Sequence, residues 1–201
     1  MSKSTDERWS PNNLSHATKM ICTGYPKDVS DDEIIQWFDQ TGAVDANLLS
    51  QLLSKEFIVL DFGGGIGRVA KHISELVKEI VVCDISNKML ELGKNEWCLG
   101  IDNIKWVQND KGNIPFPNNT FDVVYSFLCL CHLFFESNDA IYWFGEMKRV
   151  LKPDGLLCFD THFPREIDID MTQVDHFNKS STYPEGALGH VYILRKDNES
   201  P

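Results

Sequence analysis

The sequence lacks the features that would assign it to a membrane-bound or exported class. Its 201 residues contain no apolar run as long as the roughly 18 residues that are needed to span a bilayer. Its first eight residues are polar and charged, with neither a signal-peptide core nor an Arg-rich amphipathic pattern. We therefore expect a cytoplasmic protein with no membrane partner. The chain is long enough for one domain and too short for two full ones.

Positive charge and cysteine pairs are also scarce. Lys and Arg total 19 against 30 Asp and Glu, giving a net charge of -11, the wrong sign for neutralising several phosphates. The six cysteines contain no C-x-x-C pair, and most lie in apolar runs. We therefore expect no nucleic-acid partner, no disulfide and no metal, and we favour a small-molecule substrate. The oligomeric state stays open.

The first 55 residues are predicted to form an arm and helices that cover the site. Residues 1–30 mix Trp, Pro and Gly with polar residues, which indicates an irregular arm or a short helix. Ser30 is a candidate N-cap, and the three acids after it favour a helix that ends at Gly42. A second short helix is expected over residues 45–54.

Residues 56–162 alternate short apolar runs with amphipathic stretches, which is typical of parallel strands joined by crossover helices. This pattern predicts an α/β fold, a Rossmann-like, doubly wound, mostly parallel sheet with helices on both faces. The expected strands are 57–61, 79–84, 104–108, 121–127 and 155–161, and the expected helices are 67–77, 87–100 and 138–150. Residues 163–201 form an abbreviated C-terminal part, in which 189–196 is a candidate edge strand and 166–186 shows no clear strand to pair with it.

A Gly-rich turn follows the first of these strands, in the run Asp61-Phe-Gly63-Gly64-Gly65-Ile-Gly67-Arg68. Glycines let a ligand approach the backbone, and the helix N-terminus offers N–H groups to an anion. The nicotinamide fingerprint G-x-G-x-x-G would place its last glycine at position 68, which is an arginine. The carboxylate of Asp61 instead suits the cationic amino group of an amino-acid moiety, such as that of S-adenosylmethionine.

The second strand ends in another carboxylate, Asp84, about where a ribose diol lies in either kind of nucleotide site. Its alternative role is to cap a helix, although Ser86 is better placed for that. Ile85 and Met89 follow and are candidates to contact one adenine face, with plain core packing as the alternative.

The third segment resembles a known family. Asp110, Ile114-Pro115-Phe116, Phe121-Asp122-Val123-Val124 and His132-Leu133 match the ordered motifs of class I S-adenosylmethionine-dependent methyltransferases of the type 11-like group. Arg149-Val150-Leu151-Lys152-Pro153-Asp154-Gly155 also resembles the R-V-L-K-P-G-G segment of that family, with Asp154 in place of a glycine. The resemblance covers about residues 57–161. A cysteine that most relatives carry is replaced by Gly64, which can keep its backbone role.

The resemblance implies a set of cofactor-binding residues. Gly63 and Gly65 would line the methionine part, Asp84 would bind the ribose hydroxyls, Asp110 would accept from the adenine amino group, and Phe127 would lie beside the sulfonium. The full expected set is Asp61, Gly63, Gly64, Gly65, Gly67, Asp84, Ile85, Met89, Asp110, Lys111 and Phe127.

Catalytic residues are harder to choose, because in-line methyl transfer from an activated sulfonium can proceed by alignment and exclusion of water alone. If a base is needed, His132 is the first candidate, since its family position is near the substrate and His titrates near neutrality. A histidine in an apolar context can equally be a satisfied core residue. Asp160 and His162, at the end of the last parallel strand, are further candidates.

Three functions follow from these patterns. The favoured one is methyl transfer from S-adenosylmethionine to a small-molecule O, N or C nucleophile. The second is a binding module or partner subunit that holds the cofactor or its demethylated product without turnover. The third, a nicotinamide-dependent oxidoreductase, is disfavoured by Arg68 and by the Asp110 motif.

Overall fold

The structure, a computed structural model, describes residues 8–22, 28–109, 112–130, 132–133, 139–161, 170–178 and 190–197. Within these ranges seven strands form one sheet in the order β3-β2-β1-β4-β5-β7-β6. Strands β1 to β5 pair in parallel, and β7 is antiparallel to both of its neighbours. The strands are β1 Ile58–Phe62, β2 Glu79–Asp84, β3 Ile104–Gln108, β4 Phe121–Ser126, β5 Leu151–Thr161, β6 Thr172–Asn178 and β7 His190–Arg195. The predicted α/β fold is confirmed.

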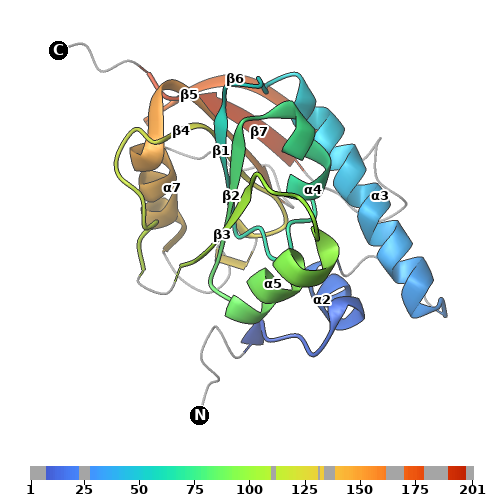
Figure 1. The fold of residues 1–201 in the computed structure, drawn as a ribbon. Helices are drawn as coiled ribbons and strands as arrows, with labels where there is room; N and C mark the ends of the chain where they lie inside the picture. Colours follow the sequence, from blue (N-terminus) through green and yellow to red (C-terminus); the bar gives the residue numbers. More distant parts are fainter. Residues whose placement is uncertain are drawn as a thin grey trace.

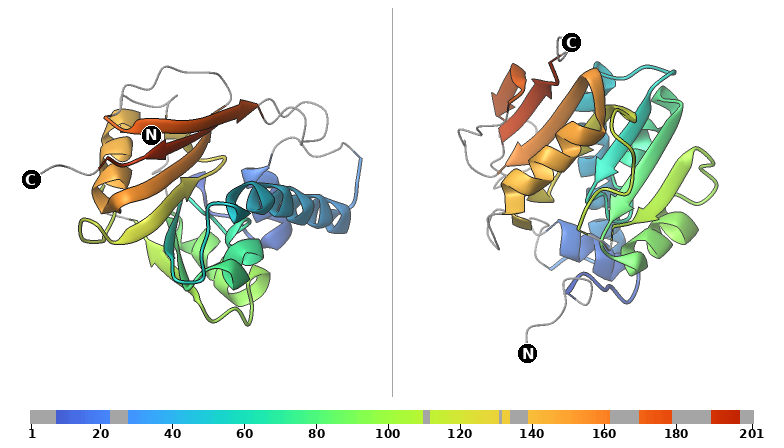
Figure 2. Two further views of the ribbon diagram at one scale, coloured as in Figure 1. Left: turned by 90° about the horizontal axis from the view of Figure 1, so that it is seen from above. Right: turned by 90° about the vertical axis from the view of Figure 1, so that its left-hand side faces the viewer.

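Helices cover both faces of this sheet (Figures 1 and 2). Helix α7 lies on one face and α3 and α4 on the other, while α2 and α5 lie toward the end of the sheet where β1 and β2 finish. The helices are α2 Leu14–Ile21, α3 Asp31–Ser50, α4 Ala70–Ile73, α5 Asn87–Leu92 and α7 Asp139–Val150. Two hydrophobic clusters result, one on each face of the sheet. None of the helices described here is both long and apolar enough to cross a membrane.

The central strands follow from their apolar runs. β1, β2 and β4 are buried over almost their whole length, because helices cover both of their faces. The observed bounds of β2 and β3 are those predicted from the sequence, and β1 is shifted by one residue. A buried strand whose run of apolar residues is bounded by polar ones leaves little freedom in its placement.

Helix α3 corrects one expectation, because it continues through Gly42 as one helix of 20 residues. Its start is as predicted: Ser30 and Glu33 form a capping box. Gly42 does not end the helix but lets it approach the turn after β1, since a Cβ there would lie 2.5 Å from the carbonyl oxygen of Arg68. Packing therefore outweighs the cost of about 1 kcal/mol for an interior glycine.

Two crossover helices are shorter than expected. After Gly67 the helix α4 spans four residues and passes into a 3-10 turn, Ser74–Leu76. Helix α5 passes into a π turn at Gly93, where the indole of Trp106 lies so close that a Cβ would be 2.4 Å from it. Close packing of an aromatic ring against the helix backbone coincides with this irregularity.

The C-terminal region also corrects the sequence analysis. Residues 166–186 showed no clear strand to pair with 189–196, yet Thr172–Asn178 forms β6 and pairs with β7, with an irregularity between Gln173 and Asp175. β6 is a polar strand at the edge of the sheet, with Val174 47% exposed. It is held by backbone pairing to one neighbour, so its side chains carry little of the apolar signal by which strands are recognised in a sequence.

Candidate cofactor and acceptor pocket

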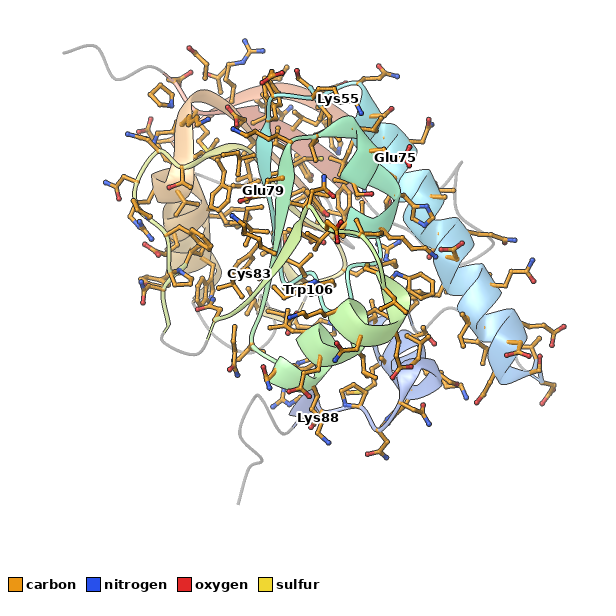
Figure 3. The ribbon with its side chains drawn as sticks, viewed as in Figure 1. Lys55, Glu75, Glu79, Cys83, Lys88 and Trp106 are labelled. Carbon is orange, nitrogen blue, oxygen red and sulfur yellow. The ribbon has the colours of Figure 1, made fainter. Side chains whose placement is uncertain are left out.

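A pocket of about 210 Å³ opens at the carboxyl ends of β1, β2 and β4. β1 lies between β2 and β4, so the strand order reverses here, which is where open α/β sheets bind ligands. Figure 3 locates this edge, with Cys83 near the end of β2 and Lys88 beyond it on α5. The pocket is lined by Trp9, Ile21, Asp61, Phe62, Gly63, Gly64, Gly65, Arg68, Val69, Cys83, Asp84, Ile85, Met89, Asn109, Gly112, Phe127, Leu128, Cys129, His132, Leu133 and Trp143.

The glycine turn forms one wall of this pocket. Gly63 and Gly65 have φ values of +69° and +56°, which side chains with a Cβ rarely adopt. A Cβ on Gly63 would lie 2.1 Å from the Sγ of Cys129, and one on Gly65 would lie 3.1 Å from Ile21. The backbone N–H of Gly63 donates to the carbonyl of Cys83 over 2.7 Å, so β2 fixes the turn. The turn is a cradle that only glycine can form.

Gly64 gives room to the carboxyl group of Asp61. A Cβ at Gly64 would lie 2.5 Å from the Cγ of Asp61 and 2.6 and 2.9 Å from its two oxygens. The carboxyl group thus fills the space that a side chain at position 64 would need.

Asp61 is 4% exposed, and burial is the largest cause that raises its pKa, to about 7. Tyr125 and Arg68 lower the pKa of this carboxyl, and the nearby charge of Asp84 raises it. Asp61 is therefore a carboxyl group whose charge depends on what binds beside it.

Asp84 stands at the end of β2 and is fixed by two backbone donors. Gly65 N–H donates to one of its oxygens over 2.9 Å, and Ser86 N–H donates to the other over 2.8 Å. Ser86 is the N-cap of α5, as its place in the sequence predicted. A carboxylate has about four acceptor positions, so two backbone donors alone do not use the full acceptor capacity of Asp84.

The predicted adenine contacts lie beyond Asp84. Ile85 and Met89 both line the pocket. The side-chain oxygen of Asn109 is buried there, and among the described residues it has no hydrogen-bond partner. A buried acceptor without a donor costs about 1 to 3 kcal/mol, so the site suits a ligand that brings an N–H. Asp110 and Lys111 lie outside the described residues.

The other side chains that line the pocket are mostly apolar. Phe127 directly follows β4 and is 7% exposed. His132 comes after it in the chain and also lines the pocket. The ring of His132 meets the indole of Trp9 edge to face, with 4.8 Å between the ring centres. The side chain of His132 is exposed, so it is not a core residue. Trp143 of α7 completes this wall.

Two predicted residues, Asp160 and Gly67, have other surroundings. Asp160 is buried, and its carboxylate accepts from the backbone N–H of Leu128 over 2.8 Å, so its contact positions the loop after β4. Gly67 has a φ of +80° and lies against Trp106, with 2.9 Å between that ring and a Cβ at this position. Neither Asp160 nor Gly67 is among the described lining residues. His162 lies outside the described residues.

The sequence analysis missed several pocket residues, above all Trp9, Ile21, Arg68 and Asn109. Trp9 and Ile21 come from the N-terminal arm, which was expected to cover the site without its contacts being known. The Ser86 hydroxyl donates to the carbonyl of Trp9 and holds the arm beside β2. Asn109 directly precedes the predicted Asp110, and Arg68 directly follows the glycine turn. The motifs next to these two residues could therefore have indicated that they line the pocket.

This strand order, with a glycine turn after β1 and a carboxylate after β2, defines the class I methyltransferase fold. Residues 60–159 match the family described as "Methyltransferase domain". Together with the fold, this match means that the chain carries a class I methyltransferase domain, and the cofactor of this class is S-adenosylmethionine.

Individual relatives agree with this assignment. The chain is 30% identical over 125 residues to the uncharacterized methyltransferase YcgJ of Bacillus subtilis, which is 62% of this chain and 48% of that protein. It is 38% identical over 105 residues to the ubiquinone/menaquinone biosynthesis C-methyltransferase UbiE of Hahella chejuensis, 49% of this chain and 40% of that protein. The chain thus spans about half or less of these two relatives.

A solved structure shares the fold. The SAM-dependent methyltransferase from Aquifex aeolicus superposes with a TM-score of 0.61 at 17% identity, covering 78% of this chain and 92% of that one. At this identity the likeness concerns the fold alone.

Proposed function

We propose that the protein transfers a methyl group from S-adenosylmethionine to a small-molecule O, N or C nucleophile. The observation that carries this proposal is that two kinds of residue line one pocket. Two acids and a glycine cradle suit the cofactor, and apolar side chains with one histidine suit an acceptor. The net charge of -11 supports a small molecule over a nucleic acid.

The residues present fit the cofactor. We assign the amino group to Asp61, the methionine chain to Gly63 and Gly65, the ribose hydroxyls to Asp84, and the adenine ring to Ile85 and Met89. The unpartnered oxygen of Asn109 supports the adenine end, because the amino group of adenine is a donor. When bound, S-adenosylmethionine supplies a methyl group already activated by its sulfonium.

The residues that suit an acceptor have three tasks. Trp9 and Trp143 exclude water and orient the acceptor, which favours in-line attack. His132 takes the proton that an acceptor hydroxyl or amine loses, since its exposed ring faces the pocket. Cys83 also lines the pocket, and burial raises the pKa of its thiol to about 12, so it does not compete as a nucleophile.

The proposal is tested by a screen of metabolite pools for release of S-adenosylhomocysteine. We expect release from at least one pool of small molecules. Binding of the cofactor without release from any pool would favour a binding module, and methylation of transfer RNA at physiological salt would show that the acceptor is a nucleic acid.

Asp84→Ala is expected to weaken binding of S-adenosylhomocysteine about tenfold or more. The change removes charged hydrogen bonds to the ribose, which are worth about 1.5 to 3 kcal/mol. Isothermal titration calorimetry measures the effect, with Asp102→Ala, an exposed acid in the loop before β3, as the matched control. Equal affinity of the Asp84 and Asp102 variants would remove Asp84 from the ribose site.

Binding of S-adenosylhomocysteine is expected to tighten as the pH rises from about 6 to about 7, by up to about tenfold per pH unit, and then to level off. The pKa of Asp61 is raised to about 7 mainly by burial. Below that pH the carboxyl group holds a proton, which a bound cationic amino group must displace. Tyr125, Arg68 and Asp84 are the ionisable groups that act on it.

The same titration with Asp61→Asn checks this assignment. The amide cannot ionise, so its binding should be weaker and independent of pH in this range, while His132→Ala should keep the dependence on pH. A wild-type affinity that does not change between these pH values would contradict the pairing of Asp61 with the amino group.

A further inference from the structure

Arg149, in the last turn of α7, is a charged side chain that the function above does not use. Its guanidinium has five N–H donors. Nε and one terminal nitrogen donate to the carboxylate of Glu146 over 2.7 and 2.8 Å. The terminal nitrogens also donate to the carbonyls of Ile114 and Phe116, over 2.9 and 2.8 Å, and to the side-chain oxygen of Asn118 over 3.1 Å. These five bonds match the five donors, so the side chain is fully engaged by the protein itself.

Glu146 binds the same loop from the same face of α7, because it stands three residues before Arg149. One oxygen of its carboxylate accepts from the guanidinium and also from the backbone N–H of Ile114, over 2.9 Å for the latter. The two side chains thus bind both backbone groups of Ile114, whose own side chain is fully buried. Hydrogen bonding between the two side chains lowers the pKa of Glu146 and raises that of Arg149, so both stay charged near neutral pH.

The loop that these two side chains hold also lines the pocket. It follows β3, and Asn109 and Gly112 are among the pocket-lining residues. The backbone N–H of Asn109 donates to the carbonyl of Asp84 over 2.8 Å, which attaches the start of the loop to β2. Figure 1 shows the loop beside α7, to which Ile114 is bound. Gly112 therefore lies in the chain between one attachment at β2 and another at α7.

A hydrogen bond to the ligand needs this loop in a fixed place. The side-chain oxygen of Asn109 is buried and has no partner among the described residues, and a hydrogen bond weakens steeply once its distance or angle leaves the favourable range. We propose that Arg149 and Glu146 are positioning residues for the cofactor's base, because they hold the loop after β3 so that this oxygen meets the amino group of adenine. This inference rests on the proposed function, which assigns adenine to the same pocket. Without the two side chains the adenine ring still contacts Ile85 and Met89, but its amino group is no longer recognised.

The test compares two ligands that differ only in this amino group, S-adenosylhomocysteine and its analogue with purine in place of adenine. By calorimetry the wild-type protein should prefer the first by about tenfold or more, because the analogue leaves the oxygen of Asn109 buried without a donor. In Arg149→Met this preference should fall close to one. Arg149→Lys should behave in the same way, because an ammonium group lacks the planar fork that spans Glu146 and the loop carbonyls. Lys148→Met, at the next residue, whose side chain pairs with the exposed Asp170, is the matched control and should keep the wild-type preference.

A merely structural role gives a different result. It would lower the melting temperature and weaken both ligands by the same factor, so an unchanged preference in the Arg149 variants would show that the proposal is wrong. If Arg149→Met does not fold, Glu146→Gln is the milder variant. It keeps an acceptor for the N–H of Ile114 but not the charge that orients Arg149, and its preference should lie below that of the wild type. Equal affinity of the wild-type protein for both ligands would also overturn the proposal, while the proposed function would stand. If the wild-type protein binds neither ligand, the proposed function itself is overturned.

Discussion

Replacing His132 by alanine is expected to lower the rate of methyl transfer about 10²- to 10⁴-fold while leaving the affinity for S-adenosylhomocysteine nearly unchanged. His132 lines the pocket, and its exposed ring meets the indole of Trp9 edge to face. In this prediction it receives a proton from an acceptor and does not hold the cofactor. Single-turnover kinetics at saturating acceptor measure the effect.

The dependence of this rate on pH separates a base from a packing residue. The wild-type rate should rise with pH through the range in which histidine titrates, and the variant should lose that rise. His176→Ala, an exposed histidine on β6, is the matched control and should keep the wild-type rate. If the His132 and His176 variants have equal rates, methyl transfer proceeds by alignment of the acceptor alone.

Asp45→Ala is expected to lower the free energy of unfolding by about 3 to 5 kcal/mol. The variant leaves the guanidinium of Arg68 buried without its carboxylate, and removal of one partner of a buried ion pair has a cost of this size. Because Arg68 belongs to the turn after β1, cofactor affinity should fall as well. Urea unfolding followed by circular dichroism gives the free energy.

Asp39→Ala provides the comparison on the same helix. Asp39 pairs with Lys71 over 2.9 Å, but its side chain is 40% exposed, and such pairs contribute at most about 1 kcal/mol. A difference of less than about 1 kcal/mol between the two variants would show that the Asp45 pair does not secure α3 to the turn.

The fold was predictable where local sequence decides local structure. β2 and β3 occur at the predicted residues because each is an apolar run bounded by polar residues. Gly42 was misread as a helix end, since only its contact with the backbone of Arg68 explains a glycine there. β6 was missed because an edge strand is held by backbone pairing and needs few apolar side chains.

The pocket residues also fall into those that the sequence predicted and those that it did not. Asp61, Gly63, Gly65 and Asp84 could be found because each stands at the end of a strand, where the motif itself shows the geometry. Trp9 could not, because its place beside His132 depends on how the N-terminal arm packs on the finished domain. Sequence motifs thus locate the glycine turn and the two acids, while tertiary packing brings Trp9 beside His132.

The central claim is that the pocket beside the glycine turn binds S-adenosylmethionine. Calorimetric titration of the wild-type protein with S-adenosylhomocysteine and, in parallel, with NADH tests this most directly. We expect one molecule of S-adenosylhomocysteine to bind per chain and NADH to give no binding heat, because position 68 is an arginine and not the last glycine of a nicotinamide site. Binding of NADH with no binding of S-adenosylhomocysteine would contradict the account.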